Sequence, residues 1–351
     1  MTTISQALPT PARSSLLNAN ALGLVLLLLL GYGVVPLIGS DYLMDAVLTP
    51  FLALALAAVG LNVLTGYAGQ VSLGSAAFLA VGAYAAYNLN LRLSWLPLLA
   101  DIVLAGGIAA AVGIVFGLPS LRLRGFYLAV STLAAQFVVQ WALTKFGWFS
   151  NDNASGVIDA PVIRVGGLTF TSATGRYVFS LTIVAVAAAL TARLLASQTG
   201  RNFIAVRDHE VAAKVIGVPL LRTKLLAFGF SSFLIGVAGV LWAFAYLRTV
   251  EPAGFNLDRS FQILFIIIIG GLASLRGAFV GAAFIVAFPL LLSRLGAAVL
   301  GSVFNSGVLE MSQRIVIGAL IIVVLIAEPR GLVALIDRTA AAARRLRSPQ
   351  P

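Results

Sequence analysis

The sequence predicts an all-α protein, a polytopic α-helical membrane protein whose helices cross a lipid bilayer many times. Two observations predict this fold class. Of the 351 residues, 60% are hydrophobic and only 10% are charged, and the mean hydropathy is +1.03, so the chain lacks the polar surface that a water-soluble domain of this size needs. Long apolar runs also recur throughout the chain, and roughly 20 apolar residues suffice to cross a hydrocarbon core.

By this length rule the chain contains about ten crossing or partly crossing helices. We expect them at residues 21–39, 46–65, 69–88, 95–118, 126–146, 177–195, 225–247, 261–272, 277–293 and 313–327. The stretch 261–293 contains Gly271 and Gly277, so two helices, one broken helix and a re-entrant pair all remain possible there. The first segment is read as a retained helix, because no small-x-small cleavage site follows it before Asp41.

The net charge of +11 follows the predicted topology. Basic residues concentrate in 193–224 and after residue 328. In the segments predicted to lie outside, acidic residues nearly balance the remaining basic residues. This is the positive-inside pattern, so the basicity indicates topology and not a nucleic-acid surface. We therefore expect a cytoplasmic N-terminal segment at 1–20, a transmembrane domain at 21–327 and a cytoplasmic tail at 328–351.

A hydrophilic stretch at 147–176 is predicted to lie outside. Within it, two β-prone runs, 162–165 and 168–171, flank a Gly-Gly pair, which is a hairpin signal. An irregular loop is the alternative, because an isolated hairpin is marginally stable without a partner surface.

A second hydrophilic stretch, 193–224, is predicted to lie inside as one or two short helices. Asp208 is placed to cap a helix, Glu210 suits its first turn, and Gly217 followed by Pro219 is a stop signal. The residues between them include an apolar stripe of Val211, Ala212, Val215 and Ile216. We therefore expect a structured surface element here and not a flexible connection.

Small residues at helical spacing predict closely packed helices. They occur at Ala109, Gly113 and Gly117, at Ser232 and Gly236, and at Gly277 and Gly281. Residues 69–78 also resemble residues 271–279 when a one-residue gap is allowed. This similarity predicts an internal pseudo-symmetric repeat with a solute pathway at the repeat interface, although a chance match in an apolar background is the alternative.

Our pathway candidates are polar side chains within the two similar segments, 69–78 and 271–279. A polar side chain in lipid costs more than one in a cavity or a hydrogen-bonded seam. We expect such side chains to face the conduit or an inter-repeat seam, at Gln70, Ser72, Ser75 and Ser274.

The chain offers little for catalysis. It has no cysteine and one histidine, His209, and it lacks both a Gly-x-Ser-x-Gly elbow and a Gly-Lys phosphate loop. We predict no catalytic residue, no metal site and no cofactor. An ion-coupled secondary transporter would need an ionisable group at mid-membrane, where only Asp101 comes close, near the outer end of a crossing. A membrane enzyme would need a nucleophile with a base. The predicted pathway must therefore draw its energy from elsewhere.

Motifs spread over most of the chain resemble the permease subunits of branched-chain amino acid ABC importers. They lie at residues 61–74, 121–129, 207–217, 270–277 and 328–332. The long external loop and Arg122-Leu123-Arg124-Gly125 resemble the LivM-type subunit more than its LivH-type sister.

The resemblance implies a type II ABC importer permease-like fold that forms half of the pathway for branched-chain amino acids in a bacterial inner membrane. The implied partners are a LivH-type sister permease, two cytoplasmic ATPase subunits that bind the ATP, and an external substrate-binding protein. Permeases for urea, short amides or aromatic acids belong to the same family, and ribose-type sugar permeases to the same superfamily. Homodimeric and heterodimeric pores both remain open.

The resemblance also implies a role for the capped cytoplasmic element. Glu210, Ala212, Ala213 and Gly217 resemble the ABC importer motif that docks into a groove of the ATPase. The match is imperfect, because Val211 intervenes and because His209 and Lys214 are unusual at their positions. The predicted ATPase-coupling residues are Asp208, Glu210, Val211, Ala212, Ala213, Val215, Ile216 and Gly217.

Overall fold

The computed structural model describes residues 29–123, 125–153, 157–165, 167–300 and, with interruptions, 311–339. The predicted segment 1–20 and most of the tail after residue 339 lie outside these residues. The predicted helix 21–39 is described only from Leu29 onward. The predicted helix 313–327 is described only at separate positions, all of them helical.

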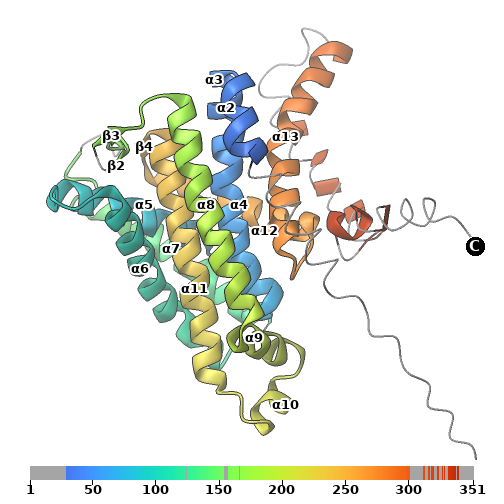
Figure 1. Cartoon of the computed structure of the whole chain (residues 1–351). Helices are drawn as coiled ribbons and strands as arrows, with labels where there is room; N and C mark the ends of the chain where they lie inside the picture. The colour runs from blue at the N-terminus through green and yellow to red at the C-terminus, as the bar shows by residue number, and fades with distance from the viewer. Residues whose placement is uncertain are drawn as a thin grey trace, which may run out of the picture.

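The described residues form a helical bundle (Figure 1). Its first half contains η1 Leu30–Val34, α2 Val35–Ile38, α3 Asp41–Leu43, η2 Met44–Leu48, α4 Thr49–Asn62, η3 Val63–Tyr67, α5 Ser75–Arg92, α6 Leu98–Gly117, η4 Leu118–Leu121 and α7 Phe126–Lys145. After three short strands come α8 Ala173–Ala196, α9 Gln198–Asp208, α10 Glu210–Val215, α11 Leu220–Val240, η5 Leu241–Leu247, η6 Pro252–Phe255, α12 Leu257–Gly270 and α13 Leu275–Leu300.

Within the described ranges, 7 helical segments are long and apolar enough to cross a membrane. They are Asp41–Tyr67, Leu98–Gly117, Phe126–Lys145, Ala173–Ala196, Leu220–Leu247, Pro252–Gly270 and Leu275–Arg294. This result confirms the predicted fold class of a polytopic all-α membrane protein.

The structure corrects the start of one predicted helix and decides between the alternatives for the stretch 261–293. The helix expected at 69–88 begins only at Ser75, because residues 68–74 are not helical and Gly69 has a φ of +68°. The stretch 261–293 forms two helices, α12 and α13, joined by residues 271–274. These helices pack tightly, because Gly270 and Gly277 leave no room for a Cβ atom between them.

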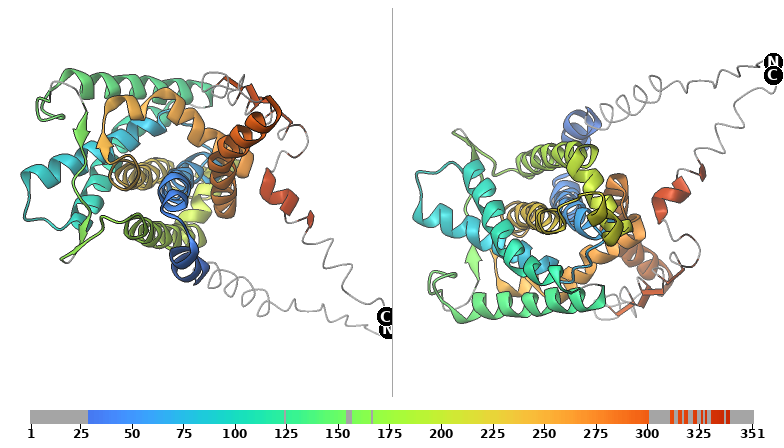
Figure 2. Two further views of the ribbon diagram at one scale, coloured as in Figure 1. Left: turned by 90° about the horizontal axis from the view of Figure 1, so that it is seen from above. Right: turned by 90° about the horizontal axis from the view of Figure 1, so that it is seen from below.

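The small residues form the predicted packing seams. Helix α6 packs antiparallel against α11, with Ala109 against Gly236 and Gly113 against Ser232. Helix α11 lies centrally in the bundle and also contacts α4 and α5, whereas α7 and α13 lie at its edges (Figure 2). Close glycine contacts let the backbones approach where lipid supplies no hydrophobic driving force.

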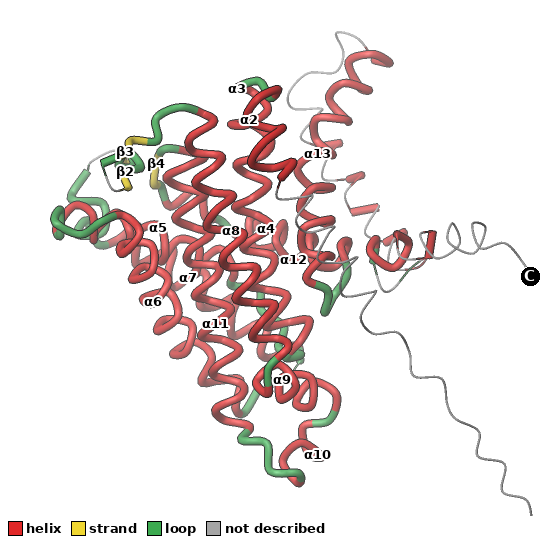
Figure 3. The backbone as a smooth tube through the Cα atoms, viewed as in Figure 1, coloured by secondary structure: helices red, strands yellow, loops and turns green. Residues whose placement is uncertain are grey.

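Short strands are confined to one end of the bundle, and α9 and α10 lie at the other (Figures 1 and 3). Strands β2 Arg164–Val165 and β3 Leu168–Thr169 pair as the predicted hairpin. Strand β1 Ile158–Asp159 also pairs with β4 Thr249–Val250, so the hydrophilic stretch is fastened to the segment after α11. The stretches predicted on opposite sides of the membrane thus lie at opposite ends of the bundle.

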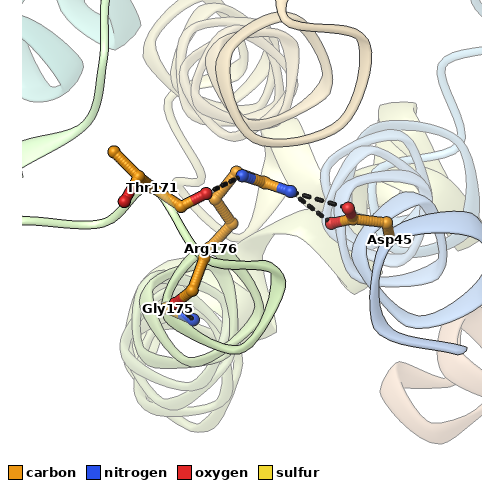
Figure 4. A network of polar contacts seen from close by, with 5 residues as sticks. Asp45, Thr171, Gly175 and Arg176 are labelled. Carbon is orange, nitrogen blue, oxygen red and sulfur yellow. Dashed lines mark hydrogen bonds and ion pairs between the residues drawn. The ribbon is translucent and has the colours of Figure 1, made fainter. Parts of the chain in front are cut away.

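An ion pair joins α8 to η2, the helical turn that leads into α4 (Figure 4). Arg176 Nη2 lies 2.6 Å from Asp45 Oδ2 and 2.8 Å from Asp45 Oδ1. The Arg176 Nη1 donates to the Thr171 carbonyl oxygen. The Arg176 side chain is only 9% exposed, so its charge is neutralised inside the protein, as buried charges require.

Candidate coupling and pathway site

The predicted cytoplasmic element is a helical hairpin made of α9 and α10. Helix α10 ends in a Schellman motif, in which Val218 N donates to Ala213 O at 2.9 Å and Gly217 N donates to Lys214 O at 3.1 Å. Gly217 has a φ of +87°, the left-handed conformation that this motif needs. The predicted stop signal is therefore present as a complete C-terminal cap.

The predicted N-terminal cap is wrong. Asp208 is the last residue of α9, and His209 occupies the N-cap position of α10 without a side-chain hydrogen bond. The Asp208 carboxylate instead accepts a hydrogen bond from Arg207 Nε at 2.8 Å. The Arg207 guanidinium thus binds the Asp208 carboxylate, which was predicted to accept from the backbone N–H groups of α10.

The outer face of α10 is apolar and exposed. Val211 is 70% exposed, Val215 82% and Ile216 74%, and Ala212 is exposed as well. We call Val211, Ala212, Val215 and Ile216 the coupling surface. An apolar surface on the element farthest from the strand end of the bundle is suited to a partner protein, because exposed apolar patches mark interaction sites.

The inner face of α10 is fixed to the bundle. Ala213 is 2% exposed, and Glu210 Oε1 lies 2.8 Å from Lys224 Nζ at the start of α11. The Lys224 side chain is 5% exposed and that of Glu210 18%. Glu210 therefore faces the bundle and holds the coupling surface in place.

Polar contacts continue from this hairpin to the non-helical residues 68–74, which we call the first break. Arg207 Nη1 donates to Gly66 O at 3.0 Å, next to the break. Gln70 Nε2 lies 3.5 Å from Lys224 O, at the residue that binds Glu210. The first break thus contacts α11 directly, and α9 contacts the residues just before the break.

The non-helical residues 271–274, the second break, lie against the end of α4. Asn62 holds them with both ends of its amide, since Nδ2 donates to Ser274 O at 2.8 Å and Oδ1 accepts from Ala273 N at 2.9 Å. Gly66 leaves no room for a Cβ atom beside Ala273. The second break is thus held against the end of α4 by the Asn62 side chain and by a close backbone contact at Gly66.

Three of the four pathway candidates are buried, and Ser274 is half-buried. Gln70 is 4% exposed, Ser72 1% and Ser75 0%. Ser72 Oγ accepts from Gly74 N at 3.4 Å, and Ser274 Oγ accepts from Gly277 N at 3.1 Å. Both hydroxyls thus support local turns, and their predicted role in the pathway stays a prediction.

A polar network around the start of α5 was missed by the sequence analysis. Thr132 Oγ1 accepts from Leu73 N at 2.9 Å, and Ser260 Oγ accepts from Ala76 N at 2.8 Å. Gln136 lies 3.3 Å from that serine hydroxyl and donates to Phe255 O at 2.8 Å. Polar residues inside the apolar runs of α7 and α12 were the available signal, as was Asn62 in α4.

A bundle of apolar helices with breaks that are buried and lined by polar groups is the architecture of a membrane transporter. A family model described as "Branched-chain amino acid transport system / permease component" matches residues 43–325. The chain therefore belongs to this family of transport permeases.

Individual relatives agree with the family. The high-affinity branched-chain amino acid transport system permease proteins LivM of Salmonella typhimurium and Escherichia coli are each 32% identical to the chain, over 62% of its length and 56% of theirs. The L-arabinose transport system permease protein AraH of Escherichia coli is 29% identical over 30% of the chain. The chain spans little more than half the length of the LivM relatives that it matches. No solved structure matches it significantly.

Proposed function

We propose that this chain is a permease subunit of an ATP-driven importer and forms half of the translocation pathway for branched-chain amino acids. In this proposal it works with a LivH-type sister permease, two ATPase subunits and an external substrate-binding protein. ATP is bound and hydrolysed on the ATPase subunits. The assembly lies in a bacterial inner membrane, with α9, α10 and both termini of the chain in the cytoplasm.

The single observation that carries this proposal is the coupling surface of α10. ATPase closure biases a pathway only if some permease surface binds the open and closed states with different free energies. That surface must be rigid, and α10 has a complete C-terminal cap and the Glu210–Lys224 ion pair. The substrate assignment is supported by the family and by the printed names of the relatives.

The contacts of the hairpin suggest how the pathway responds. Arg207 and Lys224 join α9 and α11 to the first break, and Asn62 joins the end of α4 to the second break. In this mechanism, movement of α10 reaches the first break through α9 and α11, and it reaches the second break along the chain through the end of α4. In this mechanism the breaks change the opening of the pathway, and the chain itself performs no chemistry.

The test is ATP-dependent uptake by the intact assembly. The tagged chain is purified with its bound partners from the source cells, reconstituted into vesicles and supplied with the binding protein outside. We expect L-leucine to accumulate only when ATP is present on the side of α10. Uptake driven by a proton or sodium gradient without ATP would contradict the proposal and favour a secondary transporter. Uptake of urea or acetamide in place of leucine would keep the mechanism and change the substrate.

A further inference from the structure

Arg259 is a cationic side chain within an apolar helical span. It lies in the first turn of α12, inside the apolar span Pro252–Gly270. Its neighbour Trp242 lies in η5, which ends just before β4, and β4 lies at the end of the bundle opposite to α10 (Figure 1). The Arg259 guanidinium carbon lies 4.1 Å from the centroid of the Trp242 ring, and its Nη1 donates to Gln262 Oε1. Charged residues inside membrane spans are costly and mark substrate or ion pathways.

Two neighbouring donors in this pair have no acceptor within the part of the chain that the structure describes. Arg259 Nε and Trp242 Nε1 are buried, and neither has a hydrogen-bond partner among the described residues. Trp242 is only 4% exposed, so its N–H group is held inside the protein. Buried polar groups are normally paired, although Arg176 Nε is also buried without a partner among the described residues. Arg259 and Trp242 differ from Arg176 because their two unpaired donors belong to stacked side chains, and two adjacent donors suit an acceptor from another molecule.

A second cation–π pair in the same molecule shows what a purely structural pair looks like. Arg92 lies 3.7 Å from the centroid of the Trp148 ring. Its Nη1 donates to Asn88 Oδ1 and its Nη2 to Trp148 O at 3.0 Å, so protein oxygens occupy this guanidinium. Trp148 is 58% exposed and its ring N–H does not need a protein acceptor. Stacking alone therefore does not explain the unpaired donors at Arg259.

The unpaired groups define the ligand by their chemistry. A guanidinium edge that contains Nε binds a carboxylate with two parallel hydrogen bonds, and the indole N–H is a further donor. We propose that Arg259 and Trp242 bind the carboxylate group of the transported solute at the strand end of the pathway. This proposal rests on the proposed import function, and it selects amino acids over urea and amides, which lack a carboxylate.

The proposal is tested by binding to the purified permease assembly without the binding protein. The probes are L-leucine and isoamylamine, which has the same side chain and amine but no carboxylate. Losing hydrogen bonds to a charged group costs about a factor of ten or more in affinity. We expect Arg259→Gln to weaken leucine binding by this factor and Trp242→Phe to weaken it less, because it keeps the ring. Neither change should affect isoamylamine.

Two further variants separate recognition from folding. Arg92→Gln breaks the structural cation–π pair and should leave leucine binding unchanged. Arg259→Lys keeps the positive charge but lacks the guanidinium edge that donates two parallel hydrogen bonds, so it should also weaken leucine binding. It serves as the test variant if Arg259→Gln does not assemble. Unchanged leucine affinity in both Arg259 variants, equal loss for both probes, or no leucine binding by the unaltered assembly would overturn the carboxylate site. Failure of ATP-dependent leucine uptake by the unaltered assembly would instead overturn the proposed function.

Discussion

Gly217 ends α10 in a conformation that limits what can replace it. A Cβ atom there would contact nothing within 4 Å, so a substitution acts through the backbone φ of +87° and not through a clash. Valine in this conformation costs ~1 kcal/mol or more, and tilting α10 would relieve the strain. We expect Gly217→Val to leave the permease in the membrane but to abolish ATP-dependent uptake, measured together with co-purification of the ATPase.

Two controls accompany this variant. Gly217→Asn should retain uptake, since asparagine tolerates the left-handed conformation. Gly107→Val places the same side chain on α6, at a glycine with ordinary φ and open space, and should be neutral. Normal uptake by Gly217→Val would show that this cap does not position the coupling surface.

The Arg176–Asp45 pair is a second single contact with a measurable consequence. Both Asp45 oxygens accept from Arg176, and hydrogen bonds to charged groups contribute about 1.5–3 kcal/mol. We expect Asp45→Asn to lower the thermal stability of the solubilised protein, because it leaves the mostly buried guanidinium without a carboxylate. Asp41→Asn, on the neighbouring exposed turn, is the matched control. Equal melting temperatures for both variants would show that the pair contributes nothing.

At the scale of elements, the contact between α10 and α11 can be separated from the contact between α10 and the ATPase. Glu210→Lys places two lysines together at Lys224 and should abolish uptake. The double variant with Lys224→Glu restores opposite charges, so we expect uptake to return at least in part. Uptake is measured in vesicles for each single variant and for the double variant. No recovery would indicate that Glu210 itself contacts the ATPase.

The sequence predicted those features of α10 that depend on near neighbours. The stripe, the glycine stop and the acidic residue in the first turn follow from local preferences, and all are present. The Asp208 cap failed because Arg207 binds that carboxylate. The partners of Glu210 and Asn62 could not be predicted, because they lie on segments brought together only by folding. The first break was also missed, because the length rule was applied to the whole segment 69–88 and did not weigh the glycines and polar residues at its start.

At the scale of the whole molecule, composition predicted the class of fold and most of the spans. It could not predict which helix lies at the centre, since α11 is less apolar in its sequence than α4 and α6. Its central place follows from small residues that fit those of α4, α5 and α6. Such complementarity is a property of pairs of helices and is not visible in one segment alone.

The sidedness of the membrane can be tested on the whole chain, which contains no cysteine. Val215→Cys on α10 and Leu168→Cys on β3 place single thiols at positions that are 82% and 67% exposed. Because these elements lie at opposite ends of the bundle, a membrane-impermeant maleimide should label Leu168→Cys in intact spheroplasts. It should label Val215→Cys only in inside-out vesicles from cells that express the permease without its ATPase subunits, which would cover the coupling surface. Labelling of both from one side would contradict the proposed topology.

The glycine contacts of α11 also limit how the protein can move. Gly82 abuts the backbone of Gly236, and Gly239 abuts the backbone of Leu79, so α5 and α11 touch without intervening side chains. Because no side chains separate these two backbones, sliding one helix along the other would bring backbone atoms into collision. We expect α4, α5, α6 and α11 to travel as one rigid body during transport, while the hinges of the cycle lie at the two breaks and at the peripheral helices.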